Sequence, residues 1–265
     1  MGKIIDISKW QGTKIDWDAL AKEVDLIILR ASSGTKEDSL YRTYVNECKS
    51  RKIPFGIYHY LLCNTEEEAI SAAYHIYEIA DSDAPLFYVA DVESSEIIAT
   101  DYDSVTYAYF QTLASLGVRK LGLYISQARY PKCTQCQSII DFNWIPRYGK
   151  NNGTYDSKYQ PTCDYDLHQY TDAGSVKGIP GRVDLNRLSG TKSLGWFLED
   201  RTTLPEEDIY TIDENSIIDN SKGGLFMKIT EIIDKIRGVN TEKEQDENPR
   251  EIVLVRQPDG SYKEE

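Results

Sequence analysis

The chain of 265 residues lacks any long hydrophobic run. None of its apolar segments approaches the roughly 18 consecutive apolar residues that a membrane-spanning helix requires, so we expect no membrane partner. The first six residues also lack the apolar stretch and the cleavage site of a secretory signal. We therefore expect the protein to be made in the cytoplasm of the producing cell and not to leave it by the usual export route.

Basic residues are outnumbered by acidic ones. The chain has 30 Lys and Arg against 43 Asp and Glu, a formal net charge of -13. Nucleic acids and anionic membrane surfaces attract basic proteins, so we expect neither as a partner. Most of the excess lies at the C-terminus, where residues 199–265 hold 18 acidic and 9 basic side chains. A sugar polymer is not excluded, because aromatic rings and local hydrogen bonds hold sugars.

Cysteine is scarce, and the number of cysteines is odd. Without an export signal, the five cysteines are expected to be free thiols. Cys133 and Cys136 form a CxxC pair that could bind zinc together with Cys163, but a second such pair or paired histidines are missing. We therefore expect no metal and no organic cofactor.

Eight short apolar segments recur through residues 1–190, and helical patterns separate the early ones. Near-continuous apolar runs such as residues 26–29 are typical of strands buried on both faces, which predicts a parallel sheet. Alternation of strand and helix predicts an α/β fold, namely an irregular (β/α)8-like barrel of the TIM type. The expected strands are 3–8, 25–31, 55–61, 86–91, 121–126, 141–146, 166–170 and 183–186, and the expected helices are 38–51, 65–80 and 103–116.

Composition changes near Trp196, which predicts a barrel domain over residues 1–198 and a small acidic C-terminal extension over residues 199–265. Within the extension we expect an amphipathic helix at 227–237 and a hairpin around a Pro-Asp-Gly turn, with strands at 251–256 and 260–262. A segment of this size cannot bury a core of its own. It must pack on the barrel, self-associate or stay partly disordered.

Four carboxylates lie at or just after the ends of expected strands, namely Asp6, Asp91, Glu93 and Asp184. In parallel barrels the catalytic groups come from the C-terminal ends of different strands, so these side chains should meet at one rim. Asp91 and Glu93 are two residues apart on one strand, project to the same side and lie roughly 6.5–7 Å apart. Such carboxylates repel, and the less solvated one keeps its proton to higher pH. One protonated and one ionised carboxyl group is what glycoside hydrolysis requires.

Seven motifs in this order resemble glycoside hydrolase family 25, the muramidases of many phage endolysins and bacterial autolysins. The resemblance covers about residues 3–196, and many members have Ala where this chain has Pro146. The motifs are DISKWQ at 6–11, GIYHY at 56–60, VADVE at 89–93, LYIS at 123–126, WIPRY at 144–148, HQYT at 168–171 and GRVDLN at 181–186.

The resemblance implies a lysozyme that cuts the β-1,4 bond from N-acetylmuramic acid to N-acetylglucosamine in bacterial peptidoglycan, with retention of configuration. Glu93 would be the general acid and then the base, and Asp91 would stabilise positive charge or orient the 2-acetamido group of the substrate. Asp6 and Asp184 would flank this pair. The residues implied to line the saccharide groove are Tyr58, Tyr124, Trp144 and Gln169. Retention through substrate assistance and retention through a covalent Asp91 adduct both stay open.

The resemblance implies a phage endolysin, which would reach the wall after release from the host cytoplasm. Two other functions stay open. One is a chitinase-like hydrolase of N-acetylglucosamine polymers, although the DxxDxDxE motif typical of those enzymes is absent before Glu93. The other is a non-catalytic wall-binding barrel, although all four carboxylates of the family are present. Host wall specificity and oligomeric state do not follow from the sequence.

Met227 is the only methionine after Met1. The preceding Lys222-Gly223-Gly224 can be encoded by a purine-rich ribosome-binding sequence at suitable spacing. This predicts a short product, residues 227–265, that associates with the full chain, while the simpler interpretation of Gly223-Gly224 as a hinge stays open.

Other candidates have structural interpretations. We expect His59 to be a hydrogen-bonded barrel histidine and His75 to be structural, and we assign Trp10 and Trp17 to the core.

Overall fold

The computed structural model describes residues 2–97, 101–199, 254–256 and 262–264. The chain divides into two compact units, residues 1–211 and 212–265. No helix in the described ranges is both long and apolar enough to cross a membrane.

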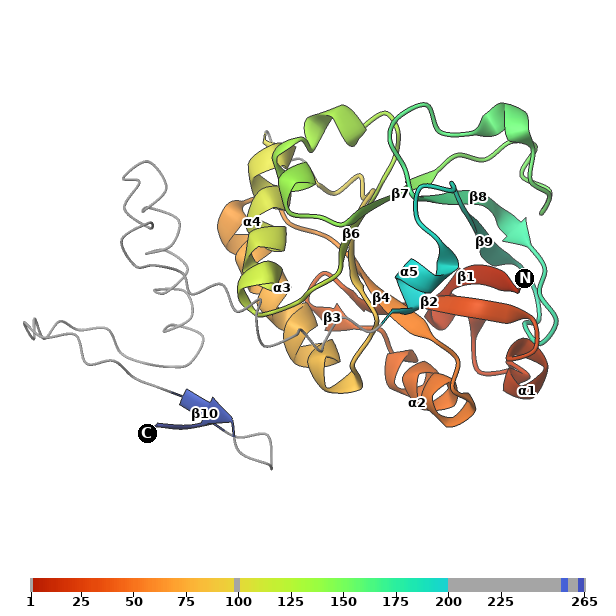
Figure 1. The fold of residues 1–265 in the computed structure, drawn as a ribbon, viewed down its shortest axis with the longest axis horizontal. Coiled ribbons are helices and arrows are strands. Elements are labelled where there is room, and N and C mark those ends of the chain that lie inside the picture. The colour runs from red at the N-terminus through yellow and green to blue at the C-terminus, as the bar shows by residue number, and fades with distance from the viewer. Residues whose placement is uncertain (1, 98–100, 200–253, 257–261, 265) are drawn as a thin grey trace, which may run out of the picture. The chain divides into compact units, whose positions relative to one another are not determined.

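The first unit is a closed barrel of eight strands, because β1 pairs with both β2 and β9 (Figure 1). All eight expected strands are confirmed, with boundaries shifted by a few residues. A two-residue strand, β3 (Lys36–Glu37), adds a hairpin to β2. The barrel strands are β1 (Lys3–Ile7), β2 (Val24–Ser33), β4 (Phe55–Tyr60), β5 (Tyr88–Val92), β6 (Leu121–Ile125), β7 (Phe142–Pro146), β8 (Leu167–Gly174) and β9 (Val183–Leu188).

The expectation of an all-parallel barrel is wrong at β9, which runs antiparallel to both β1 and β8. Only residues 175–182 separate β8 from β9, too few for the crossover that a parallel strand needs, whereas an antiparallel neighbour can follow a short loop. Asp184 therefore lies near the start of its strand, not at its end. It still reaches the rim formed by the C-terminal ends of the parallel strands, where it pairs in register with Asp6.

The helices cover the first half of the barrel, as their sequence patterns predict. Figure 1 shows α2 (Tyr41–Arg51), α3 (Glu66–Ala80) and α4 (Tyr102–Ser115) outside the strands. The short α1 (Trp17–Leu20) precedes them in the chain. After β6 the described chain has only 3-10 turns between strands, at Tyr130–Lys132, Gln135–Ser138 and Ser157–Tyr159. The barrel is therefore irregular on the side where the helical patterns are weak.

Helix α3 is capped by Thr65, and α4 begins one residue earlier than expected. The Thr65 hydroxyl accepts a hydrogen bond from Glu68 N, but the Glu68 carboxylate accepts from Asn64 N instead of closing on Thr65. Helix α4 is capped by Asp101, and Asp103 lies in its first turn. Asp103 accepts hydrogen bonds from the 3-10 segment that precedes β7.

One end of the barrel interior is filled with aromatic side chains. Phe87 and Phe142, at the N-terminal ends of β5 and β7, pack edge-to-face against Phe197 of α5 (Leu194–Leu198). The strands can hold these rings because Gly56 and Gly122 have no side chains: a Cβ at either position would lie 2.2 Å from a ring. Helix α5 thus closes the N-terminal end of the barrel with an apolar plug.

The predicted C-terminal hairpin is confirmed as an antiparallel pair, β10 (Leu254–Arg256) and β11 (Tyr262–Glu264). The predicted helix at 227–237 lies outside the described residues.

Candidate active site

A cavity of about 540 Å³ opens at the rim formed by the C-terminal ends of the parallel strands. Sixteen residues line it, and they include all eight site residues predicted from the sequence. These eight come from seven strands and the segment after β5: Asp6, Tyr58, Asp91, Glu93, Tyr124, Trp144, Gln169 and Asp184. All eight predicted site residues therefore meet at one rim of the barrel, Asp184 from the start of its strand.

Asp91 and Glu93 occupy different depths of this cavity. Asp91, within β5, is 5% exposed, and its Oδ1 has no hydrogen-bond partner among the described residues. Glu93 follows the end of β5 and is exposed at the mouth. Alternation along the strand places both side chains on the inner face, as predicted.

This difference in depth affects both protonation equilibria. Burial, followed by the negative charges of Glu93 and Asp6, raises the pKa of Asp91 well above its ordinary value. Partial burial also raises the pKa of Glu93, while the neighbouring Tyr124 hydroxyl and Arg129 guanidinium oppose the rise. Both carboxyl groups of this pair therefore keep a proton to higher pH than usual, and the deeper Asp91 is the less solvated of the two.

Asp6 and Asp184 form a second carboxylate pair, on β1 and β9. Asp6 is buried and accepts hydrogen bonds from Gln169 Nε2 at 3.0 Å and from Asn186 Nδ2 at 2.8 Å. Burial raises the pKa of Asp6 to about 6, although these two amides oppose the rise. Burial and the charges of Asp6 and Asp172 raise the pKa of Asp184 to about 8. The cavity thus gathers carboxylates that titrate far above their ordinary range.

Arg30 is the only basic residue among those that line the cavity. Its guanidinium group is held by Asp38, with Nε and one terminal nitrogen 2.8 and 2.7 Å from Oδ2. The charge of Arg30 opposes the rise in the pKa of Asp91. One cation among several carboxylates leaves the cavity electronegative, which favours bound protons and developing positive charge.

Aromatic rings form the wall beside the carboxylates. Trp144 packs edge-to-face on Tyr124 and Tyr58, with ring centroids 4.7 and 6.3 Å apart. The indole of Trp144 donates to Asn186 Oδ1 at 2.7 Å. The hydroxyl groups of Tyr124 and Tyr148 both donate to Gln169 Oε1, which fixes the Gln169 amide with its nitrogen toward Asp6.

Sequence reasoning missed several residues of this site. Arg30 lies in an apolar strand segment, and its role depends on Asp38, which follows the β3 hairpin. Tyr148 belongs to the WIPRY motif but lies beyond the end of β7. Asn186 belongs to the GRVDLN motif, and its inward direction follows from the strand period once Asp184 is placed.

The structural interpretations hold for His59 and Trp17 but not for Trp10. His59 is fully buried outside the barrel, with Nε2 2.9 Å from Gly34 O and Nδ1 3.2 Å from the Tyr109 hydroxyl. Trp17 is 7% exposed, as expected of a core residue. Trp10 is 76% exposed and lines the cavity, because the turn that carries it leaves the barrel at the rim.

Metal ligation has no candidate in the part of the chain that the structure describes. All five cysteines are free, and four of them are buried. No group of three or more His, Cys, Asp or Glu in residues 2–97 and 101–199 is placed to hold a metal ion.

The family model of the glycosyl hydrolases of family 25 matches residues 5–179. An autolytic lysozyme of Clostridium acetobutylicum is 28% identical over 201 residues, which are 71% of this chain and 56% of that protein. The chain thus spans little more than half the length of this curated relative.

Solved structures share the fold over about three quarters of the chain. GHIP of Streptococcus pneumoniae, described as a glycosyl hydrolase 25 that participates in host cell invasion, superposes with a TM-score of 0.68 at 29% identity, covering 74% of this chain and 90% of that one. The catalytic domain of the endolysin ply40 from bacteriophage P40 of Listeria monocytogenes gives 0.64 at 29% identity, covering 72% and 94%. The endolysin CTP1L, described as regulated by a secondary translation product, gives 0.59 at 25% identity, covering 72% and 67%.

Proposed function

The chain belongs to glycosyl hydrolase family 25, and we propose that it is a lysozyme that hydrolyses the β-1,4 bond between N-acetylmuramic acid and N-acetylglucosamine in bacterial peptidoglycan. The observation that carries this proposal is the Asp91–Glu93 pair, with one carboxylate buried and the other at the mouth of the same cavity. The autolytic lysozyme of Clostridium acetobutylicum supports the same activity.

Glu93 is the general acid in this proposal. Its position at the mouth lets it reach a leaving glycosidic oxygen and then a water molecule from solvent. A bound saccharide covers Glu93 and removes water from it, which raises its pKa further and keeps it protonated until the bond breaks. After the leaving group departs, the ionised Glu93 takes a proton from the attacking water.

Asp91 acts below the sugar ring. Its unpartnered Oδ1 is an acceptor for the N–H of a 2-acetamido group, whose oxygen then attacks the anomeric carbon. The same carboxylate could instead form a covalent adduct with that carbon, and both routes retain configuration. In either route a negative Asp91 stabilises the developing positive charge, and Arg30 helps it to ionise.

Asp6 and Asp184 flank the Asp91–Glu93 pair, and the aromatic wall holds the sugar. Tyr58, Tyr124 and Trp144 offer ring faces and edges beside the carboxylates, and the fixed Gln169 amide keeps Asp6 in place. A chitinase-like hydrolase and a binding-only barrel are weaker candidates, because nothing in the site favours either over the family activity.

The endolysins ply40 and CTP1L support the further proposal that the protein is a phage endolysin. It would accumulate in the host cytoplasm and reach the wall after release.

Mass spectrometry of digested peptidoglycan tests the activity. We expect the wild-type protein to release fragments with N-acetylmuramic acid at the reducing end, and Glu93→Gln to lose at least about 10³-fold in rate, as for a missing general acid. Glu96→Gln is the matched control, since Glu96 is exposed, lies three residues on and does not line the cavity. Reducing-end N-acetylglucosamine, or full activity in Glu93→Gln, would refute the proposal.

We also propose that Met227 starts a short product, residues 227–265, that associates with the full-length chain. CTP1L, described as regulated by a secondary translation product, supports this idea. Expression with a C-terminal tag should show a short band that Met227→Leu removes. Synonymous recoding of Lys222-Gly223-Gly224 should weaken the band without changing the protein. A band pattern unchanged by both alterations would mean that the two glycines are only a hinge.

A further inference from the structure

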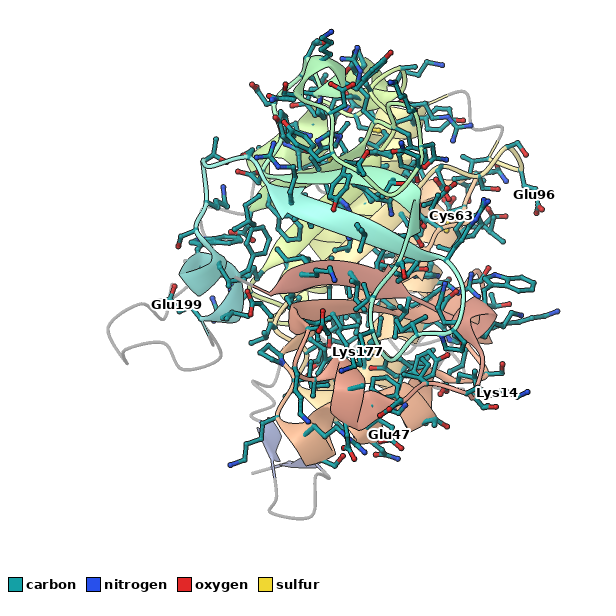
Figure 2. All side chains as sticks on the ribbon, turned by 90° about the vertical axis from the view of Figure 1, so that its right-hand side faces the viewer. Lys14, Glu47, Cys63, Glu96, Lys177 and Glu199 are labelled. Atoms are coloured by element: carbon teal, nitrogen blue, oxygen red, sulfur yellow. The ribbon has the colours of Figure 1, made fainter. Side chains whose placement is uncertain are left out.

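The turn that follows β1 presents a tryptophan to solvent at the mouth of the cavity. Among the described residues, only Trp10 and Tyr159 are large hydrophobic side chains that are exposed. Trp10 lines the catalytic cavity, and Tyr159 does not. Figure 2 labels five charged residues and Cys63, and none of these six lines this cavity. A single exposed apolar residue is common, so the inference depends on how Trp10 is held.

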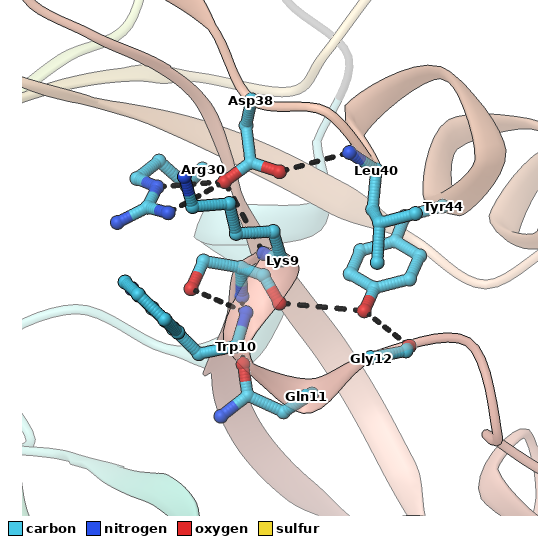
Figure 3. A network of polar contacts seen from close by, with 9 residues as sticks. Lys9, Trp10, Gln11, Gly12, Arg30, Asp38, Leu40 and Tyr44 are labelled. Atoms are coloured by element: carbon cyan, nitrogen blue, oxygen red, sulfur yellow. Dashed lines mark hydrogen bonds and ion pairs between the residues drawn. The ribbon is translucent and has the colours of Figure 1, made fainter.

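The backbone of this turn is held at both ends (Figure 3). The Ser8 hydroxyl accepts a hydrogen bond from Trp10 N, and Gln11 Oε1 accepts one from Ser8 N at 2.8 Å. The Tyr44 hydroxyl, from α2, donates to Gly12 O at 2.7 Å and contacts Ser8 O at 3.3 Å. The indole is therefore exposed on a turn that is fixed in advance of any ligand.

A buried ion pair supports the same turn. Lys9 N donates to Asp38 Oδ2 at 3.2 Å, and Asp38 also accepts from Leu40 N and from Arg30 (Figure 3). Arg30 in turn lines the cavity beside the carboxylates. One network thus links the position of Trp10 to the catalytic centre, an arrangement that makes a binding surface rigid before it is used.

We propose that Trp10 is the stacking platform of an outer sugar subsite, which binds a pyranose ring of the glycan strand beyond the two rings at the cleaved bond. This inference rests on the proposed function. The deeper rings of Tyr58, Tyr124 and Trp144 already surround the carboxylates, whereas Trp10 is at the outer edge, where a longer strand must leave the cavity.

The chemistry of the cavity selects this occupant. A pyranose ring has an apolar C–H face that packs on an aromatic ring, and an indole offers a large face at little cost in side-chain entropy. The ammonium group of Lys9 lies 5.2 Å from the centroid of the indole, so one face carries a cation and the opposite face is available. Five carboxylates line the cavity against the single Arg30, which disfavours an anionic partner such as a stem-peptide carboxylate.

Fluorescence quenching tests the contact directly. The chain has four tryptophans: Trp17 and Trp144 are 7% and 2% exposed, and Trp196 is half-buried, so acrylamide should quench mainly Trp10. The probe is soluble glycan strands, stripped of peptides by an amidase and bound to the inactive Glu93→Gln variant. We expect bound strands to lower the acrylamide quenching constant about threefold. In the double variant Glu93→Gln/Trp10→Phe, the strands should leave the quenching constant unchanged. Strands that bind without any protection of Trp10 would overturn the inference.

Kinetics provide the second test. We expect Trp10→Ala to raise KM for long glycan strands about tenfold with kcat within about twofold, since the ring contributes binding remote from the cleaved bond. A substrate of only four sugars should show a smaller effect, and Trp10→Tyr should restore most of the affinity. Tyr159→Ala is the matched control and should leave both constants unchanged. An unchanged KM in Trp10→Ala, or an equal loss on short and long substrates, would refute the subsite.

The two tests separate this inference from the proposed activity. If the wild-type protein releases no reducing-end N-acetylmuramic acid, the proposed function fails, while strand binding by Glu93→Gln still decides the role of Trp10. If hydrolysis occurs, but glycan strands do not protect Trp10 from quenching and Trp10→Ala leaves KM unchanged, only the proposed subsite is refuted.

Discussion

The two ends of the barrel interior are built in opposite ways. At the N-terminal end, Phe87, Phe142 and Phe197 pack with ring centroids 5.1 to 5.8 Å apart, and the buried Lys120 ammonium group beside them donates to backbone oxygens at the end of α5. At the other end, Asp6 and Asp91 are each 5% exposed, and burial raises the pKa of both. The first end lowers the free energy of the fold. The second end raises it and gains a set of carboxylates with raised pKa values, and such an exchange of stability for function is common.

The largest effect should come from the apolar end. Phe197→Ala should lower the free energy of unfolding by about 3–5 kcal/mol, because it leaves a cavity between two aromatic rings. The rate per folded molecule should stay within about threefold of wild type, since Phe197 lies at the opposite end of the interior from the carboxylates. Urea unfolding and wall lysis at 20 °C measure the two quantities. Phe197→Leu, which fills most of the space, is the control, and a loss of activity without a loss of stability would show that the two ends of the interior are not independent.

A smaller effect of opposite sign should come from the catalytic end. The pKa of Asp184 is about 8 in the fold and near 3.8 in an unfolded chain, so between these values the folded state binds a proton that the unfolded state does not. The free energy of unfolding therefore falls as pH rises through this window. Asp184→Asn should be more stable than wild type by about 1–2 kcal/mol at pH 8.5, with the gain lost near pH 4.

Glu96→Gln, an exposed carboxylate outside the cavity, is the control for that measurement. A gain in Asp184→Asn that persists at pH 4 would mean that charge is not its source.

The smallest expected effect sharpens the assignment of the acid. The Tyr124 hydroxyl opposes the rise in the pKa of Glu93, so Tyr124→Phe should raise that pKa. The alkaline limb of kcat/KM should move to higher pH by roughly 0.3–1 unit, because an acid catalyst stays protonated to higher pH. Tyr148→Phe is the matched control: its hydroxyl also donates to Gln169 Oε1, yet it does not act on Glu93. Equal shifts in both variants would assign the effect to Gln169.

The sequence predicts the barrel and the gathering of eight site residues, because strands buried on both faces and carboxylates at strand ends are local patterns. It does not predict the direction of β9, which depends on the length of one loop, and this loop places Asp184 at the rim from the start of its strand. It also misplaces Trp10, because an aromatic residue in a short turn has the same local pattern whether it is buried or exposed. Arg30 is missed because its partner Asp38 is brought beside it by a hairpin.

The Asp91→Asn variant measures whether the catalytic end of the barrel stores unfavourable electrostatic free energy. Asn has nearly the same shape and no charge, while Asp91 is buried with one oxygen unpartnered among the described residues. The measurement is the free energy of urea unfolding at pH 7.5, beside the rate of peptidoglycan hydrolysis. We predict a variant that is more stable than wild type and that has lost hydrolysis. A variant less stable than wild type would show instead that the buried carboxylate stabilises the fold and that the catalytic end stores no such free energy.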